Sequence, residues 1–303
     1  MSTMSDERGH APMQPLGDVL TAIVTPFTPD LQVDAIAFAR LADHLLANGS
    51  DGLVVAATTG EGPTLSDDEK VALFRHAVEV AAGRGTVIAA TGSNDTEHSV
   101  ALTRRAEDAG VDAMLVVTPY YNRPPERGLR LHFAAVAGAT TLPVIVYNIP
   151  SRCALNLSPE LLADLAAIDN VVAVKQANPD LSESRRLREL CDLGLYAGND
   201  DMTLDIVSMG GWGCISVASH LVGPRLKELV GAARAGDQAR AAAIDRDLAP
   251  LFAALFTTTN PIPVKAALNL TGHDVGGLRP PLVEASDDET RAIEAELERL
   301  GLL

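Results

Sequence analysis

Val171-Val172-Ala173-Val174-Lys175-Gln176-Ala177 runs four apolar residues, three of them β-branched, directly into a lysine. A short continuous apolar run of this kind is typical of a strand that is buried on both faces in a parallel sheet. Lysine side chains are rarely buried unless they are paired or have a chemical role. Lys175 is therefore either a lysine whose tip reaches solvent at the sheet edge or a functional amine.

An amine at the end of a buried strand has a chemical consequence. Burial disfavours the charged form, so the pKa of the amine falls and the neutral amine becomes a candidate nucleophile toward carbonyl groups. The chain holds four lysines, and the other three have simpler interpretations. Lys70 and Lys227 lie among charged residues of predicted helices, and Lys265 follows a proline-rich segment and is expected to be structural. Lys175 is thus the candidate catalytic residue.

One unit recurs along the chain: a short apolar run, a loop and a longer segment with helical spacing of apolar residues. Strict alternation of strands and helices implies parallel strands joined by right-handed crossovers. The number of units fits a closed (β/α)8 TIM barrel. An open doubly wound sheet is the alternative, but no G-x-G-x-x-G begins the first helix. The apolar runs that predict the eight strands are residues 19–24, 52–56, 86–90, 113–117, 143–147, 171–175, 195–197 and 213–217.

Short signals at the predicted helix ends support this pattern. Ser66-Asp67-Asp68-Glu69 has the form of a capping box that begins a helix. Asn48-Gly49 and Ala109-Gly110 indicate helix ends, where glycine closes the last turn.

The chain is expected to divide into three parts. Residues 1–16 are polar, lack the apolar segment of a signal peptide and predict a disordered tail. Residues 17–224 form the barrel. Residues 225–303, where the predicted strands cease, form C-terminal helices packed on the barrel.

Composition argues against several functional classes. A net charge of −16 opposes binding to the phosphates of nucleic acid. No run of about 18 apolar residues is present to span a membrane. The three cysteines, at 153, 191 and 214, lack C-x-x-C spacing, which indicates neither a disulfide framework nor a zinc site and fits a reducing cytoplasm. The predicted strand ends carry no cluster of ligands with metal spacing, so we expect no metal and no cofactor.

In a TIM barrel the chemistry lies where strands end and the following loops begin. Three of the four tyrosines lie at such ends. Each of these tyrosines could simply cap the core with its ring. Thr58 and Thr59 could belong to an ordinary turn, and Arg152 could be a surface residue. The polar strand ends are Thr58-Thr59-Gly60-Glu61, Tyr120-Tyr121, Tyr147-Asn148-Ile149-Pro150-Ser151-Arg152 and Lys175.

Taken together, these residues fit imine chemistry. A neutral lysine attacks a ketone and forms an imine, which serves as an electron sink for the adjacent carbon. Tyrosine and threonine hydroxyls can carry the protons that each step requires. Arg152 can hold a carboxylate through a bidentate pair.

On these motifs the chain resembles the class I pyruvate-dependent aldolase superfamily, most closely its dihydrodipicolinate synthase (4-hydroxy-tetrahydrodipicolinate synthase) family. The resemblance covers residues 17–303. The motifs that carry it are Thr25-Pro26-Phe27, Thr58-Thr59-Gly60-Glu61, Thr118-Pro119-Tyr120-Tyr121-Asn122-Arg123-Pro124, Tyr147-Asn148-Ile149-Pro150-Ser151-Arg152, Lys175, Ile215-Ser216-Val217 and Asn260-Pro261-Ile262-Pro263-Val264-Lys265.

The resemblance implies a cytoplasmic lyase that condenses pyruvate with aspartate 4-semialdehyde on the route to diaminopimelate and lysine. It implies a homotetramer built from two tight dimers. The implied roles are Lys175 for the imine, Tyr147 for proton donation, Thr58 and Tyr121 for completing the relay (Tyr121 from a neighbouring subunit), Thr59 and Ile215 for pyruvate, and Arg152 for the carboxylate of the semialdehyde.

Two other functions stay open at this point. One is a related lyase acting on N-acetylneuraminate, a 2-keto-3-deoxy sugar acid or a 4-hydroxy-2-oxo acid. Arg152 is poorly suited to sugar acids, because their recognition requires hydroxyl-binding groups rather than a guanidinium. The other is a non-catalytic barrel, which would not need the intact lysine, tyrosines and threonine. The chain departs from the family pattern at Ala57, Gln176 and Asn199. These departures bear on which aldehyde is the substrate.

The resemblance also bears on regulation. Many relatives are inhibited by free lysine, which binds at the tight-dimer interface. His98 stands where lysine-sensitive relatives carry a glutamate, and a histidine cannot replace that anion. Weak or no inhibition is therefore expected, unless Asp67 compensates. The matching positions are Gly62, Asp67, Lys70, Asn94, His98 and Tyr120.

Overall fold

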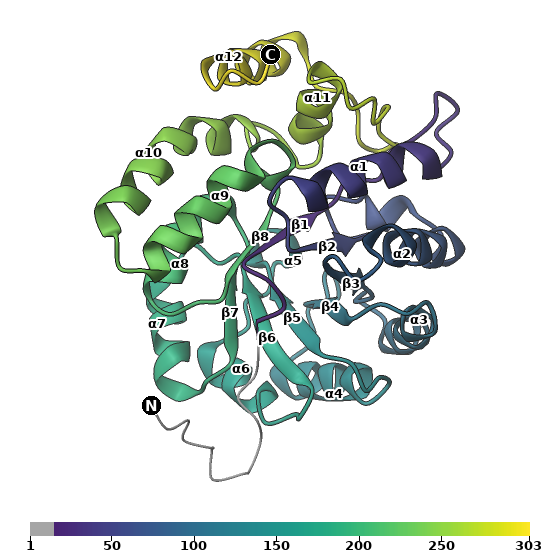
Figure 1. Ribbon diagram of the computed structural model, residues 1–303. Coiled ribbons are helices and arrows are strands. Elements are labelled where there is room, and N and C mark those ends of the chain that lie inside the picture. Colours follow the sequence, from purple (N-terminus) through teal and green to yellow (C-terminus); the bar gives the residue numbers. More distant parts are fainter. Residues whose placement is uncertain (1–14) are drawn as a thin grey trace.

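A closed barrel of parallel strands forms the centre of the molecule (Figure 1). The computed structural model describes residues 15–303, so the predicted tail, except for its last two residues, lies outside the described residues. Within that range eight strands pair in chain order, and β8 closes the barrel by pairing with β1. The predicted TIM barrel is confirmed. The strands are β1 Val19–Ala22, β2 Gly52–Val55, β3 Thr86–Ala90, β4 Ala113–Val117, β5 Val144–Asn148, β6 Val171–Gln176, β7 Gly194–Ala197 and β8 Gly213–Ser216.

Helices surround the barrel, and a short helical turn follows some of the strands. The helices are α1 Ala35–Ala47, α2 Asp67–Ala81, α3 Thr96–Asp108, α4 Glu126–Ala137, α5 Pro150–Cys153, α6 Pro159–Leu165, α7 Leu181–Leu190, α8 Thr203–Ser208, α9 Ser219–Arg234, α10 Gln238–Ala254, α11 Ile262–Leu270 and α12 Asp287–Arg299, with 3-10 turns η1 Gly62–Thr64 and η2 Asp200–Met202.

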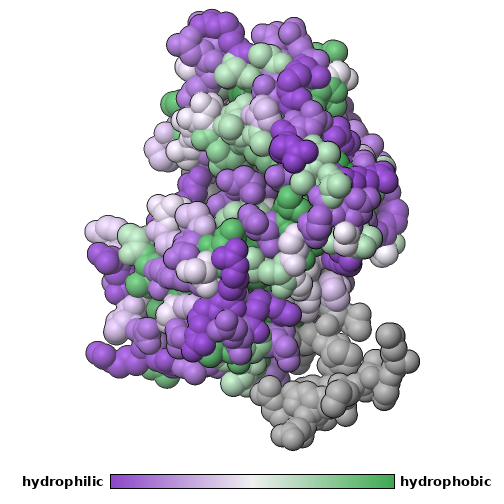
Figure 2. Space-filling model, turned by 90° about the vertical axis from the view of Figure 1, so that its left-hand side faces the viewer, coloured by the Kyte–Doolittle hydropathy of each residue, from purple (hydrophilic) through white to green (hydrophobic). Residues whose placement is uncertain are grey.

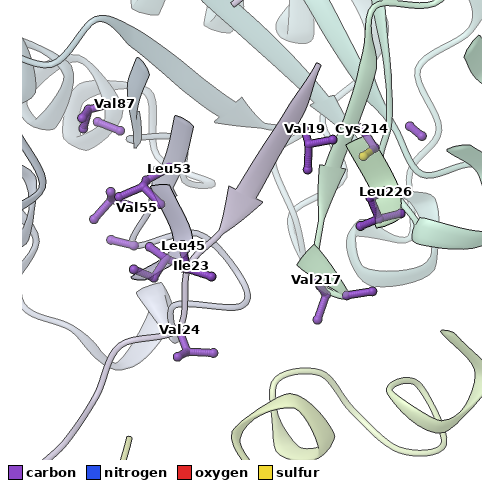
Figure 3. Packing of buried hydrophobic residues seen from close by; sticks show 14 of the residues in the cluster. Val19, Ile23, Val24, Leu45, Leu53, Val55, Val87, Cys214, Val217 and Leu226 are labelled. Carbon is purple, nitrogen blue, oxygen red and sulfur yellow. The ribbon is translucent and has the colours of Figure 1, made fainter. Parts of the chain in front are cut away.

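Two apolar layers hold this arrangement together. The outer layer lies between the strands and the helices; Leu53 and Val55 of β2, Leu45 of α1 and Leu226 of α9 belong to it (Figure 3). The inner layer fills the barrel with the alternate residues of each strand. Because successive side chains of a strand point to opposite faces, each strand supplies both layers.

This alternation decides where the polar residues at the strand ends point. On β5, Val144 and Val146 belong to the outer layer, whereas Ile145 and Tyr147 belong to the inner one. On β6 the inner residue is Ala173, so Lys175, two residues later, shares the inner side. Both functional candidates therefore lie inside the barrel at the carboxyl ends of neighbouring strands.

The predicted helix signals are found where the sequence placed them. The Ser66 hydroxyl accepts from the Glu69 amide at 3.2 Å, and the Glu69 carboxylate accepts from the Ser66 amide at 2.8 Å, which completes the capping box of α2. Asn48 caps the end of α1, and Gly110 follows α3 with a φ of 86°.

After β8 the chain is helical. α10 packs against α9 and α12, and α11 packs against α12 and α9 (Figure 1). α9 runs from Ser219 through Pro224, with non-helical angles at Val222. The expected division between residues 224 and 225 lies just after this kink, where two helical segments join, and a proline is tolerated at such a kink. How the chain divides into folding units stays a prediction.

One face of the molecule, drawn in Figure 2, is mainly hydrophilic. On this face, apolar residues occur in small groups among polar ones. None of the helices between residues 15 and 303 is both long and apolar enough to cross a bilayer. The three cysteines, all at described positions, are free thiols.

Candidate active site

A cavity of about 880 Å³ opens at the carboxyl ends of the strands. Its inner part is lined by Thr58, which follows β2, by Tyr147 near the end of β5 and by Arg152 of α5. Its outer part reaches α2 and α3, where Asp67 and His98 line it. The cavity lies where the fold places chemistry, as expected.

Lys175 lies beside Tyr147, one of the residues that line the inner part of this cavity. They are partners in the β5–β6 register, and the Lys175 amine lies 4.4 Å from the centre of the Tyr147 ring. Lys175 is 4% exposed and Tyr147 is 5% exposed. The lysine tip therefore does not reach solvent at the sheet edge, and the functional interpretation is the one that fits the geometry.

Burial changes the acidity of both groups. The loss of solvation lowers the pKa of Lys175 from 10.5 to about 8, and the carboxylate of Asp200 opposes this change. Burial also raises the pKa of Tyr147 well above its usual value, an effect that Arg152 and the Thr58 hydroxyl partly offset. The site thus pairs a partly neutral amine with a phenol that stays protonated.

Asp200 is a buried acid that the sequence interpretation did not assign to the site. It lies at the start of η2, after β7, and is 1% exposed. Its carboxylate accepts from the Ser216 hydroxyl and from the amides of Val217 and Ala218, at 3.1 and 3.0 Å. The signal for it was its place in the loop that follows the predicted strand 195–197, three residues beyond the end of that strand.

The loop after β2 presents Thr58 and Thr59 through a tight turn. The Gly62 amide donates to the Ala57 carbonyl at 3.0 Å, and the Glu61 amide donates to the Thr58 carbonyl at 3.1 Å. A Cβ on Gly62 would collide with the carbonyl oxygen of Ala56, so only glycine fits this position. The turn therefore fixes the backbone that carries both threonines.

The fully buried ion pair of Lys265 and Glu61 stabilises the same loop. The Lys265 amine donates to the Glu61 carboxylate at 2.7 Å, with side-chain exposures of 1% and 0%. Lys265 also donates to the Gly277 carbonyl at 2.6 Å, and the Arg279 amide donates to Glu61 at 3.0 Å. The sequence indicated a structural Lys265 but did not identify Glu61 as its partner.

Asn260 joins two of the candidate substrate-binding residues. Its side-chain amide donates to the Thr59 hydroxyl at 2.9 Å, and its backbone carbonyl accepts from the Arg152 guanidinium at 3.1 Å. Asn260 was part of a motif quoted for the resemblance, but nothing in the sequence connected it with Thr59.

Ile215 and Tyr121 differ in their relation to this centre. Ile215 of β8 is buried in the inner layer, together with Tyr147. Tyr121 lines the cavity but is 90% exposed, with a positive φ of 71°. Within a single chain, Tyr121 is therefore not enclosed with Lys175 and Tyr147.

The outer part of the cavity carries charged side chains that contact one another. The His98 ring nitrogen Nε2 lies 2.8 Å from the Asp67 carboxylate, and its Nδ1 lies 3.2 Å from the Ser93 hydroxyl. Lys70 lies 3.7 Å from the same carboxylate of Asp67. Asp67 is thus already engaged by two basic side chains.

Residues 15–303 contain no group of three or more histidine, cysteine or acidic side chains that could hold a metal ion.

Comparison with known proteins gives one consistent result. The chain matches the sequence profile of the dihydrodipicolinate synthetase family over residues 15–300. The 4-hydroxy-tetrahydrodipicolinate synthase of Heliobacterium modesticaldum is 50% identical over 288 residues, which cover 94% of this chain and 96% of the relative. The crystal structure of dihydrodipicolinate synthase from Thermotoga maritima is 40% identical, with a TM-score of 0.93 and coverage of 96% and 100%. The lysine-bound structure of the protein from Cyanidioschyzon merolae is 41% identical, with a TM-score of 0.93 and coverage of 95% and 99%.

Proposed function

The chain belongs to the dihydrodipicolinate synthetase family, and from this membership we propose that it condenses pyruvate with aspartate 4-semialdehyde to give 4-hydroxy-tetrahydrodipicolinate. The reaction is that of a lyase in the diaminopimelate and lysine pathway. The observation that carries the proposal is the buried amine of Lys175 beside Tyr147, with its pKa near 8. At pH 7 about one such lysine in ten is neutral, against roughly one in three thousand for an ordinary lysine.

The first half of the reaction takes place on Lys175. Its neutral amine attacks C2 of pyruvate, and the adduct loses water to give an imine between Nζ and C2. Loss of a proton from C3 gives an enamine. Tyr147, Thr58 and Tyr121 form the relay that moves these protons, since a phenol that stays protonated can donate to the departing hydroxide.

The second half uses the aldehyde. C3 of the enamine attacks the aldehyde carbon of the semialdehyde, and the aldehyde oxygen takes a proton. Because the product is cyclic, the amine of the second substrate then attacks C2 and displaces Lys175, which leaves as a free amine. No metal or cofactor is needed, because the imine itself is the electron sink.

The substrates are held at two positions. Thr59 and Ile215 hold pyruvate, and Arg152, which lines the cavity, holds the carboxylate of the semialdehyde. Arg152 follows β5, and its planar guanidinium can form a bidentate pair with a carboxylate. This arrangement supports the semialdehyde over sugar acids, whose hydroxyl groups would want neutral polar partners.

The proposed assembly is a homotetramer made of two tight dimers. Tyr121 supports the dimer, because an exposed tyrosine at the mouth of the cavity is placed to enter the site of a neighbouring copy. The proposed location is the cytoplasm, which three free thiols support.

An aldehyde panel tests the proposed function. Purified protein is incubated with pyruvate and, in parallel, aspartate 4-semialdehyde, succinate semialdehyde, N-acetylmannosamine and glyceraldehyde, and the products are identified by mass. The proposal expects the highest kcat/KM with aspartate 4-semialdehyde. A higher value with a sugar aldehyde would replace it by a related lyase, and no product with any aldehyde would favour a non-catalytic barrel.

A further inference from the structure

Asn260 brings the C-terminal part of the chain into the active site. It lies two residues before α11, outside the eight strands, and is 6% exposed. Its side chain contacts Thr59 and its backbone carbonyl contacts Arg152. One residue therefore touches both of the side chains that the proposed function assigns to the carboxylates of the two substrates.

The direction of the contact with Thr59 matters. Asn260 Nδ2 is a donor, so Thr59 Oγ1 is the acceptor of this hydrogen bond, at 2.9 Å. A hydroxyl carries a single hydrogen as well as its acceptor positions, and here that hydrogen stays free. In the part of the chain that the structure describes, no acceptor for it is present. The Thr59 hydroxyl is thus left as a donor for an anion.

A purely structural role for Asn260 explains the contacts less well. Its Oδ1 is buried and has no hydrogen-bond partner among residues 15–303. A buried acceptor without a partner is unfavourable, and an apolar side chain of similar size would avoid that penalty. An asparagine in this place is better explained by what its Nδ2 group does to Thr59.

The backbone around Thr59 is held independently of Asn260. Lys265 of α11 forms an ion pair with Glu61, two residues beyond Thr59. Thr25 donates its hydroxyl hydrogen to the Gly60 carbonyl at 2.6 Å. Loss of the Asn260 carboxamide would therefore leave the loop in place. What it would change is the orientation of the Thr59 hydroxyl.

Resting on the proposed function, we propose that Asn260 is a positioning residue for pyruvate. Its carboxamide orients the Thr59 hydroxyl as a donor to the pyruvate carboxylate. Its backbone carbonyl accepts a hydrogen bond from the Arg152 guanidinium, and this contact does not depend on the Asn260 side chain. The C-terminal part of the chain thereby contributes to substrate binding, although none of the residues proposed to react with substrate belongs to it.

Asn260→Ala, Thr59→Val and the double variant test the proposal. Asn260→Ala should raise the KM for pyruvate about tenfold, the size of one weakened hydrogen bond to a charged group, and change the KM for the semialdehyde less than about twofold. In the Thr59→Val variant, which has no hydroxyl to orient, adding Asn260→Ala should raise the KM for pyruvate by less than about twofold. Borohydride trapping of the pyruvate imine gives the same comparison without the second substrate.

Asn260→Leu is the matched control because it keeps the branched shape and approximate size of the side chain but has neither the donor nor a charge. It should raise the KM for pyruvate at least as much as alanine does, whereas a packing role would make it the milder change. It also carries the test if the alanine variant does not fold. An unchanged KM for pyruvate in these variants, or full additivity with Thr59→Val, would overturn the positioning role. Failure of the wild type to trap pyruvate would instead overturn the proposed function.

Discussion

Lys175 and Tyr147 occupy paired positions on neighbouring strands, with the amine 4.4 Å from the ring centre. Their proximity is set by the register of β5 and β6 rather than by a loop. A slip of one residue would turn one of the two side chains outward to the helices. The barrel itself thus places the amine and the phenol together, and loops supply only the groups around them.

Incubation with pyruvate and borohydride is expected to add one reduced pyruvate unit to the peptide that carries Lys175. Because only the neutral amine reacts, the trapping rate should rise with pH and level off above about 8, where the lysine is mostly deprotonated. Peptide mapping by mass checks the residue. A label on Lys70, Lys227 or Lys265, or no label at all, would contradict an imine on Lys175.

The two buried lysines are expected to respond in opposite ways to replacement by methionine. Lys175 has a lowered pKa, so the unfolded chain binds a proton more tightly than the folded chain does. Below pH 8 this destabilises the fold, and Lys175→Met should stabilise it by about 1–3 kcal/mol at pH 7. The gain should shrink as the pH rises from 8 toward 10.5, where the unfolded chain also loses the proton.

Lys265→Met is the comparison, and it should destabilise by about 3–5 kcal/mol because it leaves the buried carboxylate of Glu61 without its cation. Denaturant unfolding at pH 7 and pH 10 measures both variants. Destabilisation by Lys175→Met at pH 7 would show that the amine is better accommodated than its burial indicates.

The parts of the site that the sequence could predict are those set by strand periodicity. Lys175 and Tyr147 each end a strand on the inner side, and a period of two is readable from the residues alone. Asn260 could not be found in this way, because it lies 201 residues from Thr59 and their contact depends on how the C-terminal helices pack. Asp200 was missed for a related reason: its three donors come from the next strand and the loop after it.

The fold shows the same limit. The eight strands were predictable from apolar runs, and the capping box from four consecutive residues. The start of α9 at Ser219 was not, because Pro224 suggested that the helix begins at Arg225, whereas the chain is helical on both sides of a kink at Val222.

Arg152→Ala is expected to impair the use of aspartate 4-semialdehyde while leaving imine formation with pyruvate intact. Loss of one charge-assisted contact with a carboxylate should lower kcat/KM for the semialdehyde about ten- to a hundredfold. Steady-state kinetics and borohydride trapping measure the two effects separately. Arg152→Lys is the control, because it keeps the charge but not the bidentate geometry. An unchanged kcat/KM in the alanine variant would mean that another group holds the carboxylate.

Tyr121→Phe and Lys175→Ala are expected to complement each other when the two variants share a dimer. If Tyr121 enters the site of the neighbouring copy, each mixed dimer holds one site with both residues intact and one with neither. Activity should then recover toward half of the wild-type value per dimer. Native mass spectrometry confirms the mixing, and mixed dimers without recovered activity would place Tyr121 in the site of its own chain.

Free lysine is expected to inhibit this protein weakly or not at all at millimolar concentration. The outer part of the cavity holds Lys70 and His98, and neither is an anion that could receive the ligand's amino group. Asp67 is the acid that could replace the missing glutamate, but it already contacts His98 at 2.8 Å and Lys70 at 3.7 Å. A second ammonium group would have to displace these partners and approach the Lys70 charge.

Initial rates at saturating pyruvate, with lysine varied from micromolar to millimolar, measure this inhibition. His98→Glu should increase sensitivity to lysine, because it adds an anion and releases Asp67 from its histidine partner. His98→Gln is the matched control, since it removes the imidazole without adding charge and should stay insensitive. Inhibition of the wild type at tens of micromolar would show that Asp67 binds the amino group despite its contacts, and a glutamate variant no more sensitive than the glutamine variant would remove position 98 from the explanation.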